Sequence, residues 1–380
     1  MRKIKETRHY SKVLGRMPEG CKLCVKGAKL VLFTTGLCNR RCWYCPISKR
    51  KKNKDVVIAN EWWVKKDEDI LEEARLCDSL GAGVTGGDPL VKLDRTVKYI
   101  KLLKKKFGRD FHIHLYTPGN LASEKNLSRL YKAGLDEIRF HPTKKDLDNL
   151  KKALNFDWSV GCEIPVIPGE RRKTEEFIEC IDKMGVHFLN LNELEFSETN
   201  LENMVKRGME TVDDVSYAIE GSNEMALNLL DYCKENTSLN VHYCTLKLKD
   251  KVQLGNRIKR RAKNAAKDYD ITTKEGLFIR GAVYLPDLYP SFNYQKKVER
   301  QSRGHRKSYL NKLKRIINRM RKEYQIPGNL ISLDKQRMRV LTGAWILEDI
   351  APELKEDGLK PAIVEEYPTW DALCVDLRFL

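Results

Sequence analysis

Residues 29–45 read KLVLFTTGLCNRRCWYC, an apolar run followed almost directly by three cysteines. These are Cys38, Cys42 and Cys45, and Pro46 follows without a fourth nearby thiol. Three thiolates in one tight loop can hold three irons of a cubane iron–sulfur cluster, which leaves the fourth iron open to a substrate or cofactor. A structural zinc loop or plain reduced thiols are the alternatives, but a zinc loop closes its tetrahedron with a fourth ligand.

A second motif follows the next apolar stretch and reads Thr85-Gly86-Gly87-Asp88-Pro89. Paired glycines let a backbone approach a ligand closely because no Cβ stands in the way. Alone, such a turn would be an ordinary strand end. Its place after the cysteine loop favours a binding role.

CNRRCWYC, with the aromatic Tyr44 before its last cysteine, resembles the signature of the radical S-adenosylmethionine (radical SAM) superfamily. The Gly-Gly-Asp segment resembles that family's Gly-Gly-Glu element, with Asp88 in place of Glu. The resemblance implies a [4Fe–4S] cluster whose open iron binds S-adenosylmethionine, and reductive cleavage of that cofactor to a 5′-deoxyadenosyl radical. The implied cluster ligands are Cys38, Cys42 and Cys45.

The resemblance also implies which residues bind S-adenosylmethionine. Tyr44 is expected to reach the adenine mainly through its backbone, and Gly86, Gly87 and Asp88 to receive the methionine amino group. Residues 160–170 resemble the adenine-side strand of pyruvate formate-lyase activating enzymes, which adds Glu163. Asn192, at the end of the following strand, completes the expected cofactor site.

Strand and helix patterns alternate from Lys29 to Glu195, which predicts parallel strands with right-handed crossovers. The fold class is therefore α/β, a partial (β/α)6 barrel of the radical SAM type with a basic α+β C-terminal extension. We expect an N-terminal segment with a Cys-x-x-Cys pair at 1–28, the barrel at 29–200 and the extension at 201–380. Expected strands are 30–35, 83–85, 111–116, 137–140, 159–166 and 187–192, and expected helices include 67–80, 96–107, 124–133, 144–154, 174–184, 211–235, 247–267 and 309–324.

A possible second metal site combines Cys21 and Cys24 with the distant Cys244. Cys-x-x-Cys is a minimal bidentate loop for zinc or iron–sulfur binding, and His242 or Cys233 could supply a fourth ligand. Because many radical SAM enzymes carry an auxiliary cluster, we expect a second [4Fe–4S] cluster here. A structural zinc and no metal at all are the alternatives. His112 and His114 alternate along one strand, where ordinary barrel-lining hydrogen bonds are the favoured interpretation.

The formal net charge is +18, and residues 245–325 hold 23 Lys and Arg against 7 Asp and Glu, a net +16 from this region. Charge concentrated in one region is typical of a polyanion-binding surface. The sequence therefore predicts an RNA partner, with tRNA as the expected one; a solvated lysine-rich surface is the alternative. The predicted RNA-binding residues are Arg257, Arg260, Arg261, Lys263, Arg306, Lys314, Arg315 and Arg321.

The first residues, MRKIKETRHY, lack the apolar segment of a signal peptide, and no apolar run reaches the ~18 residues that cross a bilayer. We therefore expect a cytoplasmic protein without a membrane partner. Its eleven cysteines suit metal or redox chemistry better than disulfides in such a compartment. An electron donor such as ferredoxin or flavodoxin is the further expected partner.

Two enzymatic functions and one binding function fit these patterns. The first is modification of an unactivated carbon of a tRNA nucleoside, as in methylation or methylthiolation of a hypermodified adenosine such as threonylcarbamoyladenosine. The alternative is activation of a glycyl-radical enzyme or modification of a peptide. A non-enzymatic iron–sulfur RNA-binding protein is the third, and it leaves the Gly-Gly-Asp element unexplained.

Overall fold

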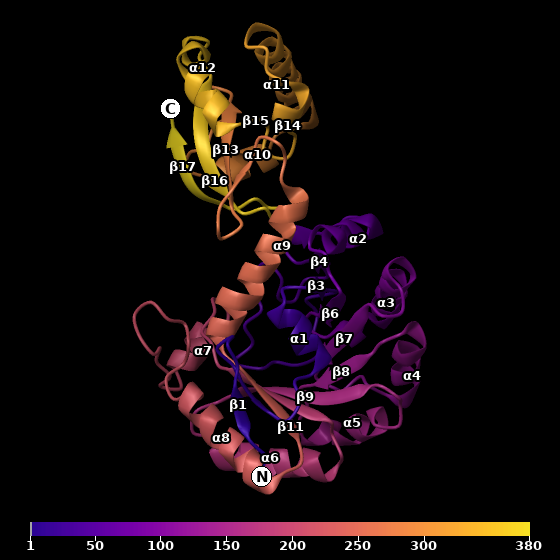
Figure 1. Ribbon diagram of the computed structural model, residues 1–380. Coiled ribbons are helices and arrows are strands. Elements are labelled where there is room, and N and C mark those ends of the chain that lie inside the picture. Colours follow the sequence, from indigo (N-terminus) through magenta and orange to yellow (C-terminus); the bar gives the residue numbers. More distant parts are fainter. Residues whose placement is uncertain (1) are drawn as a thin grey trace. The chain divides into compact units, whose positions relative to one another are not determined.

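The computed structural model describes residues 2–380, and the chain divides into two compact units. The first unit ends at Arg257, and the second spans Ile258–Leu380 (Figure 1). The first unit therefore extends well past the boundary expected at residue 200. The reason is a further strand, Asn240–Cys244, which joins the sheet of the barrel.

The first unit is built on seven parallel strands in the order β11-β10-β9-β8-β7-β6-β3. Buried aliphatic side chains such as Ile113, Ile138 and Val160 face the helices that cover the outside of the sheet. The partial barrel predicted from the sequence is confirmed, with β11 as an added strand. The strands are β3 (Lys29–Phe33), β6 (Gly81–Thr85), β7 (His112–Thr117), β8 (Glu137–Phe140), β9 (Ser159–Val166), β10 (Phe188–Glu193) and β11 (Asn240–Cys244).

Helices follow most of these strands and lie around the strands in Figure 1. Their ends agree with capping signals: Ser123 accepts a hydrogen bond at the start of α4, and Gly134 ends that helix with φ 98°. The outer helices are α2 (Asp67–Leu76), α3 (Leu93–Phe107), α4 (Glu124–Ala133), α5 (Leu147–Ala153), α6 (Arg171–Lys183) and α8 (Ser222–Asn236), with the 3-10 turns η1 (Pro89–Lys92) and η2 (Lys144–Asp146).

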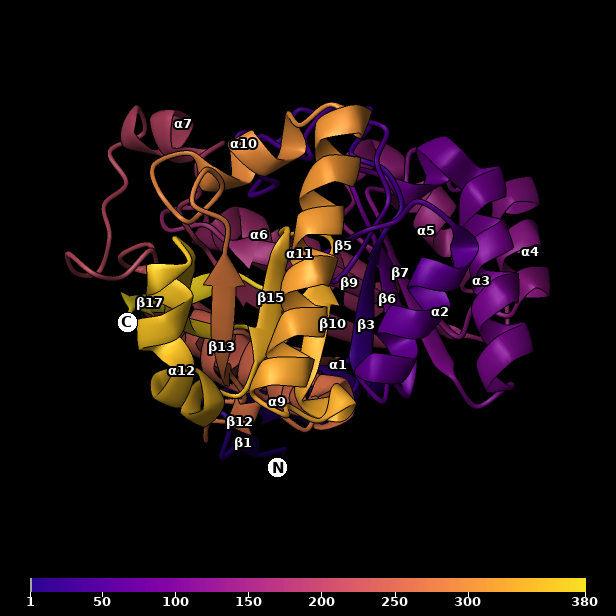
Figure 2. The ribbon, with the colours of Figure 1, turned by 90° about the horizontal axis from the view of Figure 1, so that it is seen from above.

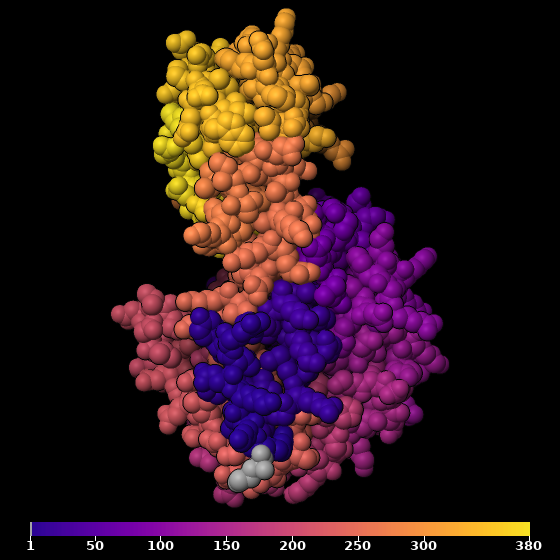
Figure 3. Space-filling view, viewed as in Figure 1, coloured from indigo at the N-terminus to yellow at the C-terminus, as the bar shows by residue number. Residues whose placement is uncertain are grey.

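The N-terminal segment is part of the first unit. β2 (Lys12–Leu14) pairs antiparallel with β11, and β1 (Ile4–Glu6) pairs antiparallel with β2. Helix α1 (Glu19–Val25) contacts β3, β6 and β7. In Figure 3 the indigo N-terminal residues lie between the purple helices and the salmon part of this unit.

Helix α1 touches the inside of the barrel through Gly20. A Cβ at Gly20 would lie 2.6 Å from both Arg139 Nη2 and His114 Nδ1. Only a glycine therefore allows this close approach of the helix to the polar side chains of the strands.

Short elements complete the first unit. β4 (Ile58–Ala59) and β5 (Trp62–Trp63) extend the sheet antiparallel beyond β3. The helix expected over 211–235 begins only at Ser222, because Gly221 adopts φ 76° and residues 211–219 form bridges instead. α7 (Leu201–Val205) precedes this stretch, and the π-helix η3 (Leu248–Leu254) leads into α9 (Gly255–Ala265).

The second unit has the β-α-β-β-α-β element order of a ferredoxin-like fold. Its sheet runs β14-β15-β13-β16-β17, and α11 and α12 lie along it (Figure 2). Leu313 and Met320 of α11 and Leu347 of α12 share one core with Val283 and Val340. The elements are β12 (Ile271–Thr272), β13 (Phe278–Tyr284), α10 (Tyr294–Glu299), α11 (Arg303–Glu323), η4 (Gly328–Leu330), β14 (Ile331–Asp334), β15 (Arg339–Thr342), α12 (Ala344–Glu356), β16 (Lys360–Glu366) and β17 (Cys374–Phe379).

Among the helices of residues 2–380, none combines the length and the apolar character that a bilayer crossing requires.

Candidate functional site

A cavity of about 910 Å³ opens at the carboxyl ends of the parallel strands. Parallel α/β sheets place their chemistry at this edge because loops from several strands converge there. The lining side chains come from the cysteine loop and from the ends of five strands. They include Cys38, Cys42, Tyr44, Cys45, Gly86, Gly87, Tyr116, Arg139, His141, Glu163, Asn192, Glu195 and Lys249.

The three cysteines of the loop all line this cavity and are half-buried. The Arg40 backbone N–H donates a hydrogen bond to Cys38 Sγ at 3.3 Å, and Cys45 N–H donates to the Cys42 carbonyl at 3.3 Å. Burial raises the pKa of the Cys38 and Cys42 thiols. Thiols in this state gain most from a bound metal, whose positive charge offsets the cost of the thiolate.

The loop is fastened by two residues that the sequence did not single out. Thr199 Oγ1 donates to the carbonyls of Cys45 (3.0 Å) and Ile47 (2.8 Å). Asn200 Nδ2 donates to the Tyr44 carbonyl at 3.0 Å and to the Glu195 carbonyl at 3.0 Å. The Tyr44 backbone, expected to contact an adenine, thus already carries a bond to the chain. A Ser-x-Thr-Asn stretch after the last core strand is too common a turn sequence to reveal this role.

Gly86 and Gly87 bring the end of β6 against the cysteine loop. Gly87 N–H donates to the Thr35 carbonyl at 2.8 Å, and Asp88 N–H donates to the Leu37 carbonyl at 2.8 Å. A Cβ on Gly86 would collide with the Thr35 carbonyl oxygen, and one on Gly87 with that of Leu37. The paired glycines are therefore needed for the packing of the loop itself, whatever they bind.

Replacing Gly86 with alanine should lower the free energy of unfolding by about 1–3 kcal/mol, because the backbone of the cysteine loop must move away. Reconstituted iron content should fall with it, since the moved loop carries the thiols. Gly255→Ala is the control: that glycine meets no atom within 4 Å, so we expect a change within about 1 kcal/mol. Urea unfolding and iron analysis measure both. Equal losses in the two variants would contradict the packing argument.

The Asp88 side chain supports the turn and does not line the cavity. Its Oδ1 accepts from Leu90 N–H at 3.1 Å and from Thr117 Oγ1 at 3.0 Å. Burial raises the pKa of Asp88 to about 6. A role of this segment in cofactor binding therefore falls to its main chain.

Glu163 and Asn192 line the cavity as expected, but their polar groups bind one another. The Glu163 carboxylate accepts from Arg139 (2.8 Å), Asn190 (2.9 Å) and Asn192 (2.9 Å). Burial works against the charged form, yet Arg139 and the two amides outweigh it and hold the pKa of Glu163 below its ordinary value. The carboxylate is thus a fixed anion at the floor of the cavity.

Tyr44 is held by a chain of hydrogen bonds that reaches the same strand. Its hydroxyl lies 2.5 Å from His141 Nε2, and His141 Nδ1 lies 2.9 Å from the Glu163 carbonyl. Since a carbonyl only accepts, Nδ1 carries the proton, and Nε2 accepts from the tyrosine. Burial lowers the pKa of His141, so the ring stays neutral in this position.

Cys21, Cys24 and Cys244 come together inside the first unit. All three are buried, and the electrostatic environment of Cys244 includes both other thiols. Asn190 Nδ2 donates to Cys21 Sγ at 3.3 Å, and Gln253 Nε2 lies 3.8 Å from Cys244 Sγ. Cys244 thus lies within electrostatic reach of both other thiols, and a metal site formed by the three stays a prediction.

The two candidate fourth ligands of this cysteine group, His242 and Cys233, lie in different surroundings. His242 is buried, and neither ring nitrogen has a hydrogen-bond partner. Cys233 instead lies in the outer hydrophobic core on α8, so it is unavailable. Among residues 2–380, the sulfur atoms of Cys21, Cys24 and Cys244 do not all lie within 4.8 Å of one another. A single tetrahedral zinc ion would need them about 3.8 Å apart.

The predicted RNA-binding residues do not form one surface. Arg257 is buried and makes a bidentate ion pair with Glu61 at 2.6 and 2.7 Å, so the prediction for it is corrected. Arg261 is also buried, and Arg260 is half-buried. Arg306 is half-buried and donates to the Lys335 carbonyl at 2.7 Å. The exposed members are Lys263, Lys314, Arg315 and Arg321.

The sequence of α9 explains the error. Its cations were predicted to bind RNA, which requires exposed side chains, but Arg257 and Arg261 are four residues apart and therefore share one side of the helix, which is buried. Charge counting along a sequence cannot identify the acidic partner of a buried arginine.

Comparison with protein families gives two matches. The model of the radical SAM superfamily matches residues 32–143, which include the cysteine loop and the Gly-Gly-Asp segment. A domain of unknown function matches residues 307–378, within the second unit.

Several curated proteins are similar in sequence, and two of them are described here. One from Methanocaldococcus jannaschii, named "Putative glycyl-radical enzyme activating enzyme", is 42% identical over 377 residues, covering 95% of this chain and 92% of that protein. A PqqA peptide cyclase of Granulibacter bethesdensis is 26% identical over 123 residues, covering 32% of this chain and 31% of the cyclase.

Many solved structures are also similar, and two of them serve as examples. SuiB of Streptococcus suis, bound to S-adenosylmethionine, has a TM-score of 0.41 and 12% identity, covering 57% of this chain and 50% of that chain. TsrM of Kitasatospora setae, a radical S-adenosylmethionine methyltransferase with cobalamin and a [4Fe–4S] cluster bound, has a TM-score of 0.34 and 10% identity, covering 61% of this chain and 52% of that chain.

Proposed function

Because the chain belongs to the radical SAM superfamily, we propose that it acts on a protein or peptide, as a glycyl-radical enzyme activating enzyme. The observation that carries this proposal is the whole-chain similarity to the M. jannaschii protein of that name, which extends through both units. The partly matching PqqA peptide cyclase also has a peptide in its name. These similarities support activation of a glycyl-radical enzyme over RNA modification, which was expected from the charge of the sequence.

The cofactors of the superfamily fit the residues present. Three half-buried thiols and the Arg40 N–H···S bond form a ready cradle for a [4Fe–4S] cluster beside a cavity large enough for S-adenosylmethionine. When bound, this pair supplies a 5′-deoxyadenosyl radical that takes a hydrogen atom from a glycine Cα, leaving 5′-deoxyadenosine and a glycyl radical. The required electron comes from a donor, for which ferredoxin or flavodoxin is the candidate class.

The chain's own residues position and shield this chemistry. Cys38, Cys42 and Cys45 are the cluster ligands, and the main chain of residues 86–88 lies ready to accept the methionine amino group. The Tyr44–His141 bond fixes the aromatic wall of the cavity. Glu163 and Asn192 keep their positions through Arg139 and Asn190, so the floor of the cavity is polar but rigid.

The buried cysteine group of Cys21, Cys24 and Cys244 is assigned to an auxiliary [4Fe–4S] cluster. Burial of all three thiols and the hydrogen bonds to Cys21 and Cys244 support it. Iron and sulfide analysis of a Cys38/Cys42/Cys45 triple-alanine variant tests this assignment. Four residual irons support it, and zinc or no metal rejects it.

tRNA modification remains the second candidate, and one observation favours it. Helix α11 exposes Lys307, Lys312, Lys314, Arg315, Arg321 and Lys322 to solvent. If this surface binds tRNA, methylation or methylthiolation of a hypermodified adenosine such as threonylcarbamoyladenosine is the reaction to seek. Its affinity must then fall steeply with salt, because binding releases counterions from the phosphates.

One experiment separates the two substrates. Anaerobically reconstituted protein, S-adenosylmethionine and dithionite are mixed with either the protein fraction or the tRNA fraction of cells that lack the gene. We expect the protein fraction to stimulate 5′-deoxyadenosine formation and to develop an organic radical signal in electron paramagnetic resonance. Stimulation by tRNA alone, with a new modified nucleoside in mass spectrometry, would replace the proposal with the second candidate.

A further inference from the structure

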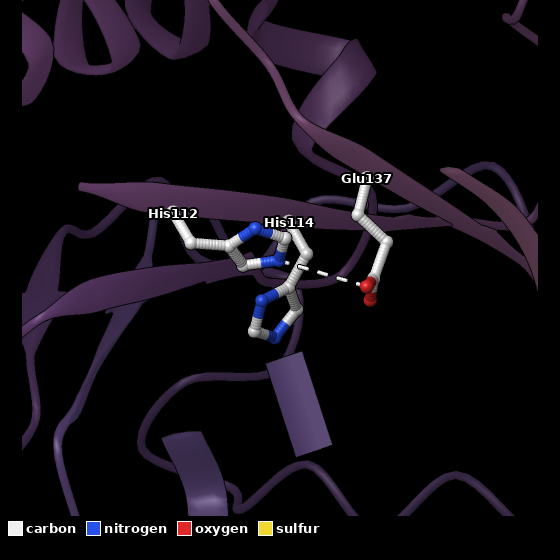
Figure 4. A group of neighbouring side chains, drawn as sticks. All are labelled: His112, His114 and Glu137. Atoms are coloured by element: carbon white, nitrogen blue, oxygen red, sulfur yellow. Dashed lines mark ion pairs between the residues drawn. The ribbon is translucent and has the colours of Figure 1, made fainter. Parts of the chain in front are cut away.

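His112, His114 and Glu137 converge at the amino ends of β7 and β8, opposite the edge that carries the cysteine loop (Figure 4). Their donor atoms all lie within 4.8 Å of one another. We propose that these three side chains bind a divalent zinc ion in a site separate from both cysteine groups. This site does not depend on the function proposed above.

The geometry of the pair in Figure 4 is that of two zinc ligands. His112 Nε2 lies 3.5 Å from Glu137 Oε2, along the dashed line of the figure. Tetrahedral zinc with ligand bonds of about 2.0–2.2 Å places donor atoms roughly 3.3–3.5 Å apart. A direct hydrogen bond between these atoms would be shorter, and His112 Nε2 makes none.

His114 supplies the third donor. It is fully buried, and its Nδ1 has no hydrogen-bond partner. Its Nε2 lies 3.3 Å from the Tyr116 hydroxyl. When Nε2 donates to that oxygen, Nδ1 is left with a lone pair, the arrangement by which outer partners orient metal-binding histidines.

The protonation states suit a metal. Burial, followed by the charges of Arg139 and Lys29, lowers the pKa of His114 well below its ordinary value, so the ring is neutral. Burial favours a neutral Glu137, but Arg139 and His112 outweigh it and lower the pKa of Glu137 to about 2. His114 and Glu137 therefore offer an imidazole and a carboxylate donor at neutral pH without first losing protons.

The neighbouring cations Arg139 and Lys29 limit the affinity for zinc, but they leave one carboxylate oxygen of Glu137 available to bind it. Arg139 Nε donates to Glu137 Oε1 at 2.6 Å, whereas Oε2 turns toward His112 and the Gly20 N–H, 3.5 Å away. Arg139 and Lys29 oppose a further positive charge, so we expect moderate affinity. Two histidines and one carboxylate also leave a fourth position for water, as in other His₂Glu zinc sites.

The test is zinc binding by the full chain with its iron–sulfur clusters reconstituted, so that the cysteine thiols are occupied and do not take up the added zinc. We expect about one zinc per chain, measured by elemental mass spectrometry, with only nitrogen and oxygen neighbours in zinc-edge X-ray absorption. His112→Gln and His114→Gln should lose most of this zinc. His242→Gln is the matched control, because His242 is a buried histidine without hydrogen-bond partners on another strand and should leave zinc unchanged.

The cysteines provide the decisive comparison. A Cys21/Cys24/Cys244 triple-serine variant should keep the zinc. Sulfur neighbours in the absorption spectrum, loss of zinc in that variant, full zinc content in both histidine variants, or no zinc in the wild type would each overturn the proposal. Because absorption is measured on the wild type, a misfolded variant cannot hide the answer.

Discussion

Replacing Cys42 with alanine is expected to reduce 5′-deoxyadenosine formation to the background seen without reductant. Cys42 lines the cavity between the other two cysteines, and two thiols cannot hold a cubane with one open iron. Loss of a ligand should cost more than the about 10–100-fold that loss of an outer partner costs at metal sites. Chromatography of the nucleoside products, with visible absorption for the cluster, measures the effect.

Cys374→Ala is the matched control, because this thiol is exposed on β17 in the second unit. It should keep both iron content and activity. Activity that survived in Cys42→Ala, or was lost equally in Cys374→Ala, would remove the cysteine loop from the centre of the chemistry.

Replacing Arg139 with methionine should destabilise the first unit by about 3–5 kcal/mol, the usual result of removing one partner of a buried ion pair. The guanidinium is 2% exposed and binds Glu137 at 2.5 Å and Glu163 at 2.8 Å. Its removal leaves the buried Glu137 and the half-buried Glu163 without this counter-charge. Arg172→Met is the control, because Arg172 is 94% exposed and its pair with Glu176 should contribute about 0–1 kcal/mol.

The stability of the wild type and that of Arg139→Met should change with pH in opposite directions. Since the pKa of Glu137 is lowered to about 2, the wild type should lose stability as pH falls from about 4.5 toward 2. In Arg139→Met these carboxyl groups should instead have raised pKa values, so the variant should lose stability as pH rises above about 4.5, the ordinary pKa of a glutamate. Urea unfolding across pH measures both. Parallel pH profiles of variant and wild type would show that Arg139 does not set these charges.

Much of the barrel could be predicted because its signals are local. A five-residue apolar strand before the cysteine loop, and helices with caps such as Ser123, repeat with a regular period. β11 was placed outside the barrel because a strand of five residues after a long insertion carries no mark of its partner. Only the parallel pairing of Val241 with Leu189 shows where it belongs.

The residues of the candidate site could likewise be predicted only in part. The three cysteines and the paired glycines belong to short sequence motifs, so these residues of the cavity wall could be predicted from the sequence. Thr199 and Asn200 bind the carbonyls of Cys45, Ile47 and Tyr44, more than 150 residues earlier, and nothing near them predicts those contacts. The error at Arg257 has the same origin, since Glu61, 196 residues away, binds it.

The antiparallel pairing of β2 with β11 makes the two ends of this barrel depend on each other during synthesis. The Arg2 side chain bonds the carbonyl of Thr237, 235 residues further along the chain. Strands β1 and β2 are synthesised first, but β2 cannot pair until β11 has been synthesised as well. The pairing of β2 with β11 is therefore a late and slow step of folding.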